Sequence, residues 1–92
     1  DDDSFRKLFS TTSIKRIGRN RFLRNILIAV GNSGDNNFIN DILPLLRDES
    51  NLVRAMAVWS LSQLCNKEKF KKLKKSYFHL ENDIDVIKEW KR

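Results

Sequence analysis

Apolar residues fall at helical spacing along most of the chain, and they are densest between Arg19 and Asp35. The apolar side chains of this stretch are Phe22, Leu23, Ile26, Leu27, Ile28, Ala29 and Val30. Soluble helices that are apolar around most of their circumference are buried on several sides. The pattern therefore predicts a central helix over Arg19–Gly31 that is the most buried element of the fold and stops at Gly31-Asn32-Ser33-Gly34.

Helical spacing also predicts elements on both sides of the central helix. A short helix is expected over Asp1–Phe9, followed by a basic loop over Ile14–Arg19, with Asn20 as the N-cap of the central helix. The later helices are expected from Phe38 to Leu46 with a kink at Pro44, over Asn51–Leu64 with Asn66 closing it, over residues 67–79, and over Ile84–Trp90. The sequence thus predicts an all-α fold of five or six helices.

A short pattern repeats about every 30 residues. Asn20-Arg21-Phe22-Leu23-Arg24 aligns with Ser50-Asn51-Leu52-Val53-Arg54, and a degenerate third copy follows at Asp83-Ile84-Asp85-Val86-Ile87. Each copy places an N-cap residue three positions before an aliphatic residue, and a helical hairpin separates the copies. This period is typical of α-solenoids, so we expect short HEAT-like repeats, two helix pairs with a helical cap at each end. Arg24 and Arg54 hold matched positions, and we interpret both as structural, bonding groups such as those of Asp48.

Positive charge is unevenly spread along the 92 residues, whose net charge is +6. Residues 6–24 hold seven basic side chains and no acid, while residues 67–75 hold six lysines against Glu68 alone. Segregated positive charge favours a polyanionic partner. A solubilising surface explains residues 67–75 equally well. It explains residues 6–24 less well, since arginine dominates there and arginine binds phosphate in a bidentate manner.

The candidate nucleic-acid-binding residues come from these two segments. They are Lys15, Arg16, Arg19, Arg21, Lys71, Lys72 and Lys75. We expect the arginine segment to hold RNA more tightly than the lysines, because a loop at the entrance of a buried helix partly pre-organises its side chains. Such a loop also lies beside helix N-terminal N–H groups, which donate hydrogen bonds to a phosphate.

Catalytic and metal-binding patterns are absent from the sequence. His79 is the only histidine and Cys65 the only cysteine, and neither has a partner at metal-ligand spacing. We therefore expect no catalytic residue, no metal and no cofactor in the chain itself. A lone cysteine fits a reducing compartment such as the cytoplasm, and the central apolar run is too short to span a membrane.

Residues 8–35 resemble the C-terminal part of epoxyqueuosine reductase. The matching positions are Phe9, Thr12, Ile14, Arg16, Gly18, Arg19, Phe22, Leu23, Arg24, Asn25, Ala29, Gly31 and Asn32. Asp48 to Leu61 resembles the HEAT-like unit that follows in that family, and Glu89-Trp90 resembles its terminal segment. Thr11 and Ser13 depart from the pattern, because the family has glycine and proline there.

This resemblance implies a parent oxidoreductase that reduces epoxyqueuosine to queuosine at the wobble position of tRNA, using cobalamin and two [4Fe–4S] clusters. The cluster ligands would lie upstream, and residues 1–92 would form a single C-terminal HEAT-like domain. That domain is implied to contact the rest of the parent enzyme and the anticodon region of the tRNA. Two other functions stay open: a freestanding HEAT-like protein–protein adaptor, and a small non-specific nucleic-acid binder.

Overall fold

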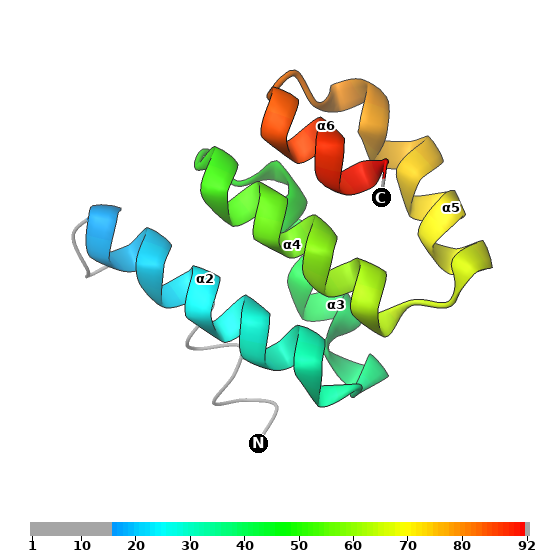
Figure 1. Ribbon diagram of the computed structural model, residues 1–92, viewed down its shortest axis with the longest axis horizontal. Helices are drawn as coiled ribbons and strands as arrows, with labels where there is room; N and C mark the ends of the chain where they lie inside the picture. Colours follow the sequence, from blue (N-terminus) through cyan, green and yellow to red (C-terminus); the bar gives the residue numbers. More distant parts are fainter. Residues whose placement is uncertain (1–15, 92) are drawn as a thin grey trace.

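The computed structural model describes residues 16–91, and all regular structure in this range is helical (Figure 1). The α-helices are α2 (Arg16–Ser33), α3 (Ile39–Ile42), α4 (Asn51–Leu64), α5 (Lys67–Tyr77) and α6 (Ile84–Trp90). The 3-10 helices are η1 (Asn36–Phe38), η2 (Leu43–Arg47) and η3 (Phe78–Leu80). The all-α prediction is confirmed for these residues. None of their helices is long and apolar enough to cross a membrane. The helix expected over Asp1–Phe9 lies outside the described residues.

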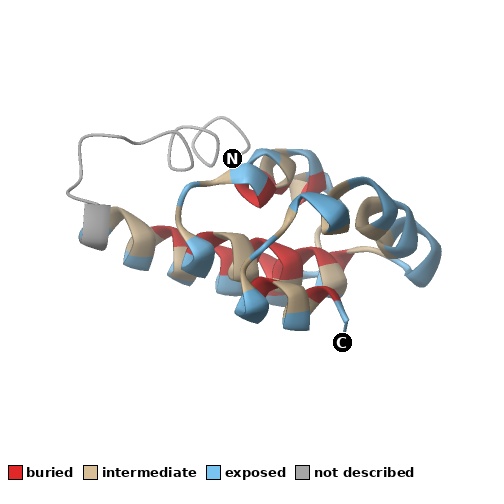
Figure 2. Cartoon of the chain, turned by 90° about the horizontal axis from the view of Figure 1, so that it is seen from above, coloured by how far each residue is buried: buried red, intermediate tan, exposed pale blue. Residues whose placement is uncertain are grey.

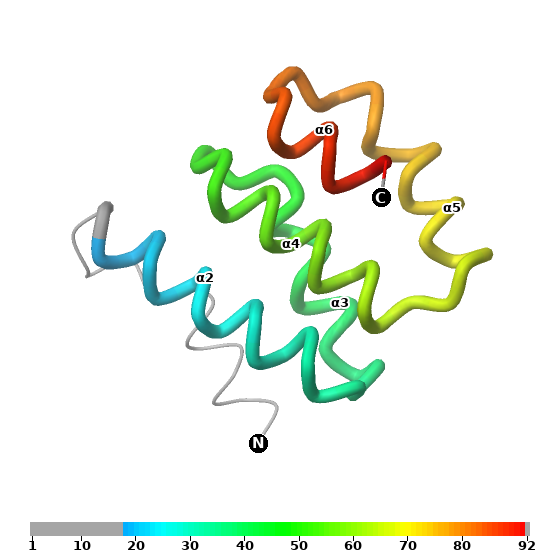
Figure 3. The backbone as a smooth tube through the Cα atoms, in the orientation of Figure 1, coloured from blue at the N-terminus to red at the C-terminus, as the bar shows by residue number. Residues whose placement is uncertain are grey.

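Helices α2, α4 and α6 lie side by side and run in the same direction, with α4 in the middle (Figures 1 and 3). The segment made of η1, α3 and η2 links α2 to α4, and its α3 and η2 parts pack against α4. Helix α5 and η3 make the equivalent link from α4 to α6. Each link between parallel helices is therefore itself helical, and α4 packs against α2, α3, η2 and α6.

Helix α4, rather than α2, holds the most buried residues among the described elements. Buried residues gather in the middle of the molecule, where the helices meet (Figure 2). The buried residues of α4 are Val53, Ala57, Val58, Ser60, Leu61 and Leu64. On α2, Leu23, Leu27 and Val30 are buried, but Ile28 and Ala29 are exposed. The prediction that Arg19–Gly31 is the most buried element is therefore wrong, because α4 packs against α2 on one side and α6 on the other.

Helix α2 begins earlier than predicted, and it ends at Ser33, within the predicted stop Gly31-Asn32-Ser33-Gly34. It starts at Arg16, so Gly18 and Asn20 lie within it, and the expected loop and N-cap are wrong over the described residues. The arginines and leucines of this run favour a helix strongly enough to include Gly18. The stop is Gly34, whose φ of +70° is the left-handed conformation that ends many helices.

The other helix ends follow from capping side chains. Ser50 and Asp83 cap α4 and α6, with side-chain oxygens that accept the N–H groups of Val53 and Val86. These two helices have the predicted bounds. Asn66 was expected to close α4, but its side chain accepts the N–H of Lys69 at 2.8 Å and so caps α5.

Two predicted helices are divided in the structure. The helix expected from Phe38 to Leu46 is instead a short α-helix between two 3-10 helices. Pro44 lies in the first turn of η2, where its missing N–H leaves the α-helical ladder without a donor. The helix expected over residues 67–79 ends at Tyr77, and the chain tightens into η3 before the turn at Glu81.

Gly31 lies at the closest approach of α2 to α4. A Cβ atom at this position would lie 2.6 Å from Cζ3 of Trp59 and 3.1 Å from Oγ of Ser60. Ser60 is fully buried, and its hydroxyl donates a hydrogen bond of 2.8 Å to the carbonyl oxygen of Leu27. Because Gly31 has no side chain, the backbone of α2 can lie directly against Trp59 and Ser60 of α4. Of the two glycines in the predicted stop, Gly31 therefore serves packing and Gly34 ends the helix.

We predict that Gly31→Ala lowers the free energy of unfolding by up to about 2 kcal/mol. Overpacking costs about 1–3 kcal/mol, while replacing glycine by alanine inside a helix returns about 1 kcal/mol. Urea unfolding followed by circular dichroism measures the difference. Asn32→Ala, at the exposed neighbouring position, is the control and should change stability by less than about 0.5 kcal/mol. A Gly31→Ala variant more stable than the natural chain would contradict this close approach.

Candidate nucleic-acid interface

An arginine of α2 holds the turn that leads into α4. Arg19 donates from Nη2 to Oδ1 of Asp48 at 2.6 Å and from Nη1 to Oδ2 at 3.3 Å. Oδ2 of Asp48 also accepts the backbone N–H of Ser50, the cap of α4, at 3.0 Å. We call Arg19, Asp48 and Ser50 the first clamp. Its ion pair is largely shielded from solvent, with the side chains 21% and 8% exposed.

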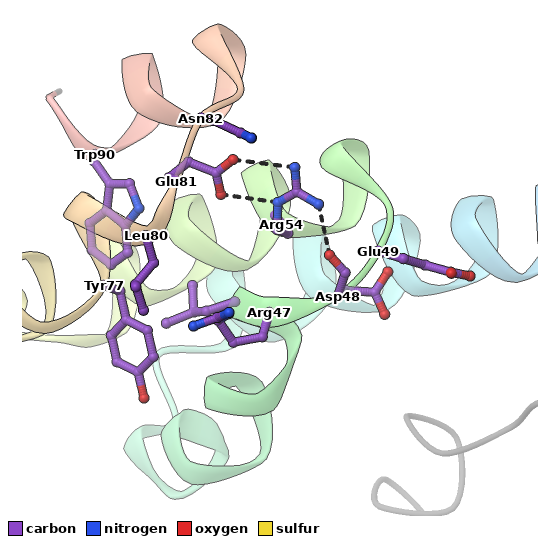
Figure 4. Close-up of a pocket in the computed structure, with 10 residues that line it drawn as sticks. Arg47, Asp48, Glu49, Arg54, Tyr77, Leu80, Glu81, Asn82 and Trp90 are labelled. Atoms are coloured by element: carbon purple, nitrogen blue, oxygen red, sulfur yellow. Dashed lines mark hydrogen bonds and ion pairs between the residues drawn. The ribbon is translucent and has the colours of Figure 1, made fainter.

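The same arrangement recurs one helix later (Figure 4). Arg54 of α4 donates from Nε to Oε1 of Glu81 at 3.0 Å and from Nη2 to Oε2 at 3.2 Å. Oε2 of Glu81 accepts the backbone N–H of Asp83, the cap of α6, at 3.0 Å. Arg54, Glu81 and Asp83 form the second clamp. Nη1 of Arg54 also donates to the carbonyl oxygen of Asp48 at 2.7 Å, so the two clamps are linked.

The structural role expected for Arg54 is confirmed, whereas Arg24 does not take the matching role. The hydrogen bonds of Arg24 within the described residues go to Oδ1 of its neighbour Asn25. Arg19, five positions earlier, occupies the place at Asp48. The repeat alignment correctly placed an arginine of α2 at the turn of Asp48, but the arginine that bonds to Asp48 is Arg19 and not Arg24.

Asp48 titrates below its ordinary range. Burial alone would raise its pKa, but the hydrogen bonds from Arg19 and from the Ser50 N–H, with the charges of Arg19 and Arg54, outweigh burial and lower it. A carboxyl group whose pKa is lowered by folding adds stability above its unfolded pKa. This contribution is lost as the pH falls through the folded-state pKa.

We therefore predict that Asp48→Asn destabilises the protein at neutral pH and that this deficit shrinks on acidification below about pH 4, the unfolded pKa of aspartate. Thermal unfolding of both proteins between pH 7 and pH 2 measures the deficit. A deficit that stays constant over this range would contradict a role for the charge of Asp48.

The arginine segment of the predicted interface is only partly open. Lys15 lies outside the described residues, and Arg16 begins α2 with a side chain that is also outside them. Arg19 is bound to Asp48 in the first clamp. Arg21 is exposed and is the one predicted arginine whose described side chain faces solvent without a clamp partner. The premise that these residues form a loop is wrong for 16–19.

The predicted lysines are all exposed on α5, but they do not share one surface. Lys71 lines a groove of about 270 Å³ beside α6, together with Lys67, Phe70, Lys74 and Trp90. We call this the α5–α6 groove. Lys72 lines a different groove of about 360 Å³, with Asn66, Glu68, Lys69 and Leu73, which we call the Glu68 groove.

Sequence reasoning missed four basic residues of this region: Lys67, Lys69, Lys74 and Lys91. The first three belong to the lysine run, and their helical spacing already divides them between two sides of α5. Nothing in the sequence pattern indicated that Lys91 belongs to this region. Its Nζ lies 6.0 Å from the ring centroid of Phe78, and Nζ of Lys74 lies 5.6 Å from the same centroid. Helical spacing of four residues brings Lys74 to this ring, whereas tertiary packing brings Lys91 to it.

A cavity of about 290 Å³ lies beside the second clamp (Figure 4). Its lining residues are Leu46, Arg47, Asp48, Glu49, Arg54, Tyr77, Leu80, Glu81, Asn82 and Trp90. Arg54 and Glu81 neutralise each other here, and the lining carries charges of both signs. This cavity therefore offers no concentrated positive charge for a polyanion.

Metal-binding groups are not found among the described residues, where no three His, Cys, Asp or Glu side chains converge. Burial raises the pKa of the Cys65 thiol, so the thiolate that binds metals is disfavoured. His79 is exposed on η3.

In comparisons with known proteins, no family model, no curated protein and no solved structure matches this chain.

Proposed function

We propose that this chain is an RNA-binding module that holds RNA through its phosphates. The observation that carries the proposal is α5, which bears six lysines against the single acid Glu68. Five of these lysines are exposed and the sixth, Lys74, is half-buried. Lysines that neutralise phosphates release condensed counterions, and this supplies sequence-independent affinity for nucleic acid.

The scaffold of this module is proposed to be a short HEAT-like repeat. Two features support the assignment: the parallel alignment of α2, α4 and α6, and the recurrence of the clamp at equivalent turns. In each clamp an arginine on one helix binds a carboxylate two residues before the cap of the next helix. A unit that contacts only its neighbours and repeats its contacts is what a solenoid requires.

The RNA is proposed to be the anticodon region of a tRNA, and the module to be the C-terminal domain of a cytoplasmic enzyme resembling epoxyqueuosine reductase. The resemblance of residues 8–35 and 48–61 supports this assignment. The other domains of such an enzyme would supply its reduction chemistry, including the iron–sulfur clusters and the cobalamin. This chain would bind the tRNA and position it.

Salt dependence of RNA binding tests the proposal. Fluorescence anisotropy with an anticodon stem-loop should give an affinity that falls with salt, with a slope of log K against log salt of about −3. This slope corresponds to three or four phosphate contacts and to a loss of about 60-fold between 50 and 200 mM salt. Undetectable binding, or binding insensitive to salt, would contradict the proposal and favour a protein–protein adaptor.

Arg21 is the residue with which to test, in the same assay, whether the arginine segment contributes to binding. Arg21→Gln removes one exposed charge without touching a clamp. If Arg21 contacts a phosphate, the slope should flatten by about 0.7–0.9. Arg19 is unsuitable for this purpose, because its replacement would also open the turn at Asp48.

A further inference from the structure

We propose that the α5–α6 groove, with Lys91 at its edge, is the site that binds a stretch of sugar–phosphate backbone, and that the Glu68 groove on the other side of α5 does not. This inference rests on the proposed function and names the part of the surface that performs it.

The α5–α6 groove gathers positive charge without any acid. Lys67, Lys71 and Lys74 are spaced by one helical turn each, so their ammonium groups form a row along one side of α5. The groove lining contains no aspartate or glutamate. A row of cations along a concave surface follows the row of charges that a phosphate backbone presents.

Aromatic rings line the groove and hold Lys74 and Lys91 in place. Phe70 and Trp90 form the floor of the groove, with ring centroids 5.3 Å apart. Phe78 lies under the ammonium groups of both Lys74 and Lys91, at the distance of a cation–π contact. The attraction of both cations to one ring offsets part of their mutual repulsion and keeps two positive charges close together before any ligand arrives.

The Glu68 groove differs in charge and in its floor. Its two lysines, Lys69 and Lys72, share the groove with Glu68, and no aromatic residue lines it. Glu68 and Lys72 are four positions apart on the helix, with the acid N-terminal, which is the favourable arrangement for an ion pair. This groove therefore carries a net charge of one, against three in the α5–α6 groove.

The aromatic floor favours contact with the backbone over contact with bases. Trp90 is only 2% exposed, so it offers no open face on which a base could stack. Lys74 and Lys91 cover Phe78 in the same way. Binding through the row of lysines therefore depends on phosphate charge and not on base identity.

Two charge-matched variants of the full chain test this inference. The groove variant carries Lys67→Gln, Lys71→Gln and Lys74→Gln. The control variant carries Lys69→Gln, Lys72→Gln and Lys75→Gln on the same helix, and so loses the same net charge. Both are titrated with the anticodon stem-loop and with a hairpin of unrelated sequence from 50 to 200 mM salt, after thermal unfolding has confirmed that both are folded.

The groove variant is expected to lose at least tenfold in affinity at 50 mM salt, equally for both hairpins, and its salt slope should flatten by about two units. The control variant should lose less than threefold. Phe78→Leu keeps every charge but removes the shared ring, and we expect it to weaken binding by two- to fivefold. Equal losses in the groove and control variants would overturn the inference while leaving RNA binding intact. Failure of the natural chain to bind either hairpin would overturn the proposed function as well.

Vesicles with about one third phosphatidylserine are the second ligand in this test, because a lipid surface also presents phosphates. We expect them to bind more weakly than the hairpins and not to distinguish the two variants. Vesicle binding that requires the α5–α6 groove, with hairpin binding that does not, would overturn the assignment to nucleic acid.

Discussion

Replacing Leu27 by alanine is expected to lower the free energy of unfolding by about 2–5 kcal/mol. Leu27 is fully buried, on the face of α2 that packs against α4. Truncation to Cβ removes its buried apolar surface and leaves a cavity that the neighbouring helices fill only in part. The hydrogen bond from Ser60 to the carbonyl oxygen of Leu27 holds the two backbones in place, so the site has little freedom to collapse.

Ile28→Ala is the matched control for Leu27→Ala. Ile28 is the next residue of the same helix, but it is 36% exposed, and its truncation should cost less than about 1 kcal/mol. Chemical denaturation of the three proteins with a shared slope gives both differences. A loss below about 1 kcal/mol for Leu27→Ala would mean that α2 does not pack on α4 as the structure describes.

The elements that the sequence predicted best are those whose ends depend on local chemistry. Helices α4 and α6 have the predicted bounds, and they begin where predicted because Ser50 and Asp83 bond to backbone N–H groups two or three residues away. The start of α2 was missed because Gly18 and Asn20 resemble a turn and a cap. The helix propensity of the whole run set the start of α2, and the local turn and cap residues did not.

Burial was predicted less well than helix position. The apolar circumference of the central helix indicated burial on several sides, yet Ile28 and Ala29 are exposed. Hydrophobic periodicity identifies a surface that a helix can bury, but the number of neighbouring helices decides how much is buried. Helix α4 is the more buried of the two: it carries Arg54 as its single charged residue, against four arginines in α2, and it has a parallel helix on each side.

The candidate site was predicted in outline. The lysine run 67–75 marked an exposed basic helix, which the structure has. Three features depended on contacts between distant residues and could not be found from spacing. They are the pairing of Arg19 with Asp48, the contribution of Trp90 to the groove beside Lys67, Lys71 and Lys74, and the approach of Lys91 to Phe78.

Replacing Arg54 by methionine is expected to lower the free energy of unfolding by about 3 kcal/mol, at the lower end of the range for removing one partner of a buried ion pair. Methionine keeps the apolar stem of Arg54 but removes its guanidinium. The side chain of Glu81 is 6% exposed, so its carboxylate would then lie largely shielded from water without its cation. The carbonyl oxygen of Asp48 would lose a hydrogen bond of 2.7 Å at the same time.

Arg24→Met is the control for Arg54→Met, because the two arginines hold matched positions in the sequence repeat. Arg24 bonds only to its neighbour Asn25 among the described residues, so its replacement should cost less than about 0.5 kcal/mol. Similar losses in the two variants would contradict the second clamp.

A double-mutant cycle then separates the charge pair from the rest of the clamp. Glu81→Gln alone leaves Arg54 without its carboxylate and should be destabilising. In the Arg54→Met background the same change removes a buried, unpaired charge, so it should restore part of the lost stability. A coupling of at least 1 kcal/mol between the two sites is expected for residues that bond directly. If Glu81→Gln costs the same in both backgrounds, Arg54 and Glu81 act independently, and the clamp does not hold α6 to α4.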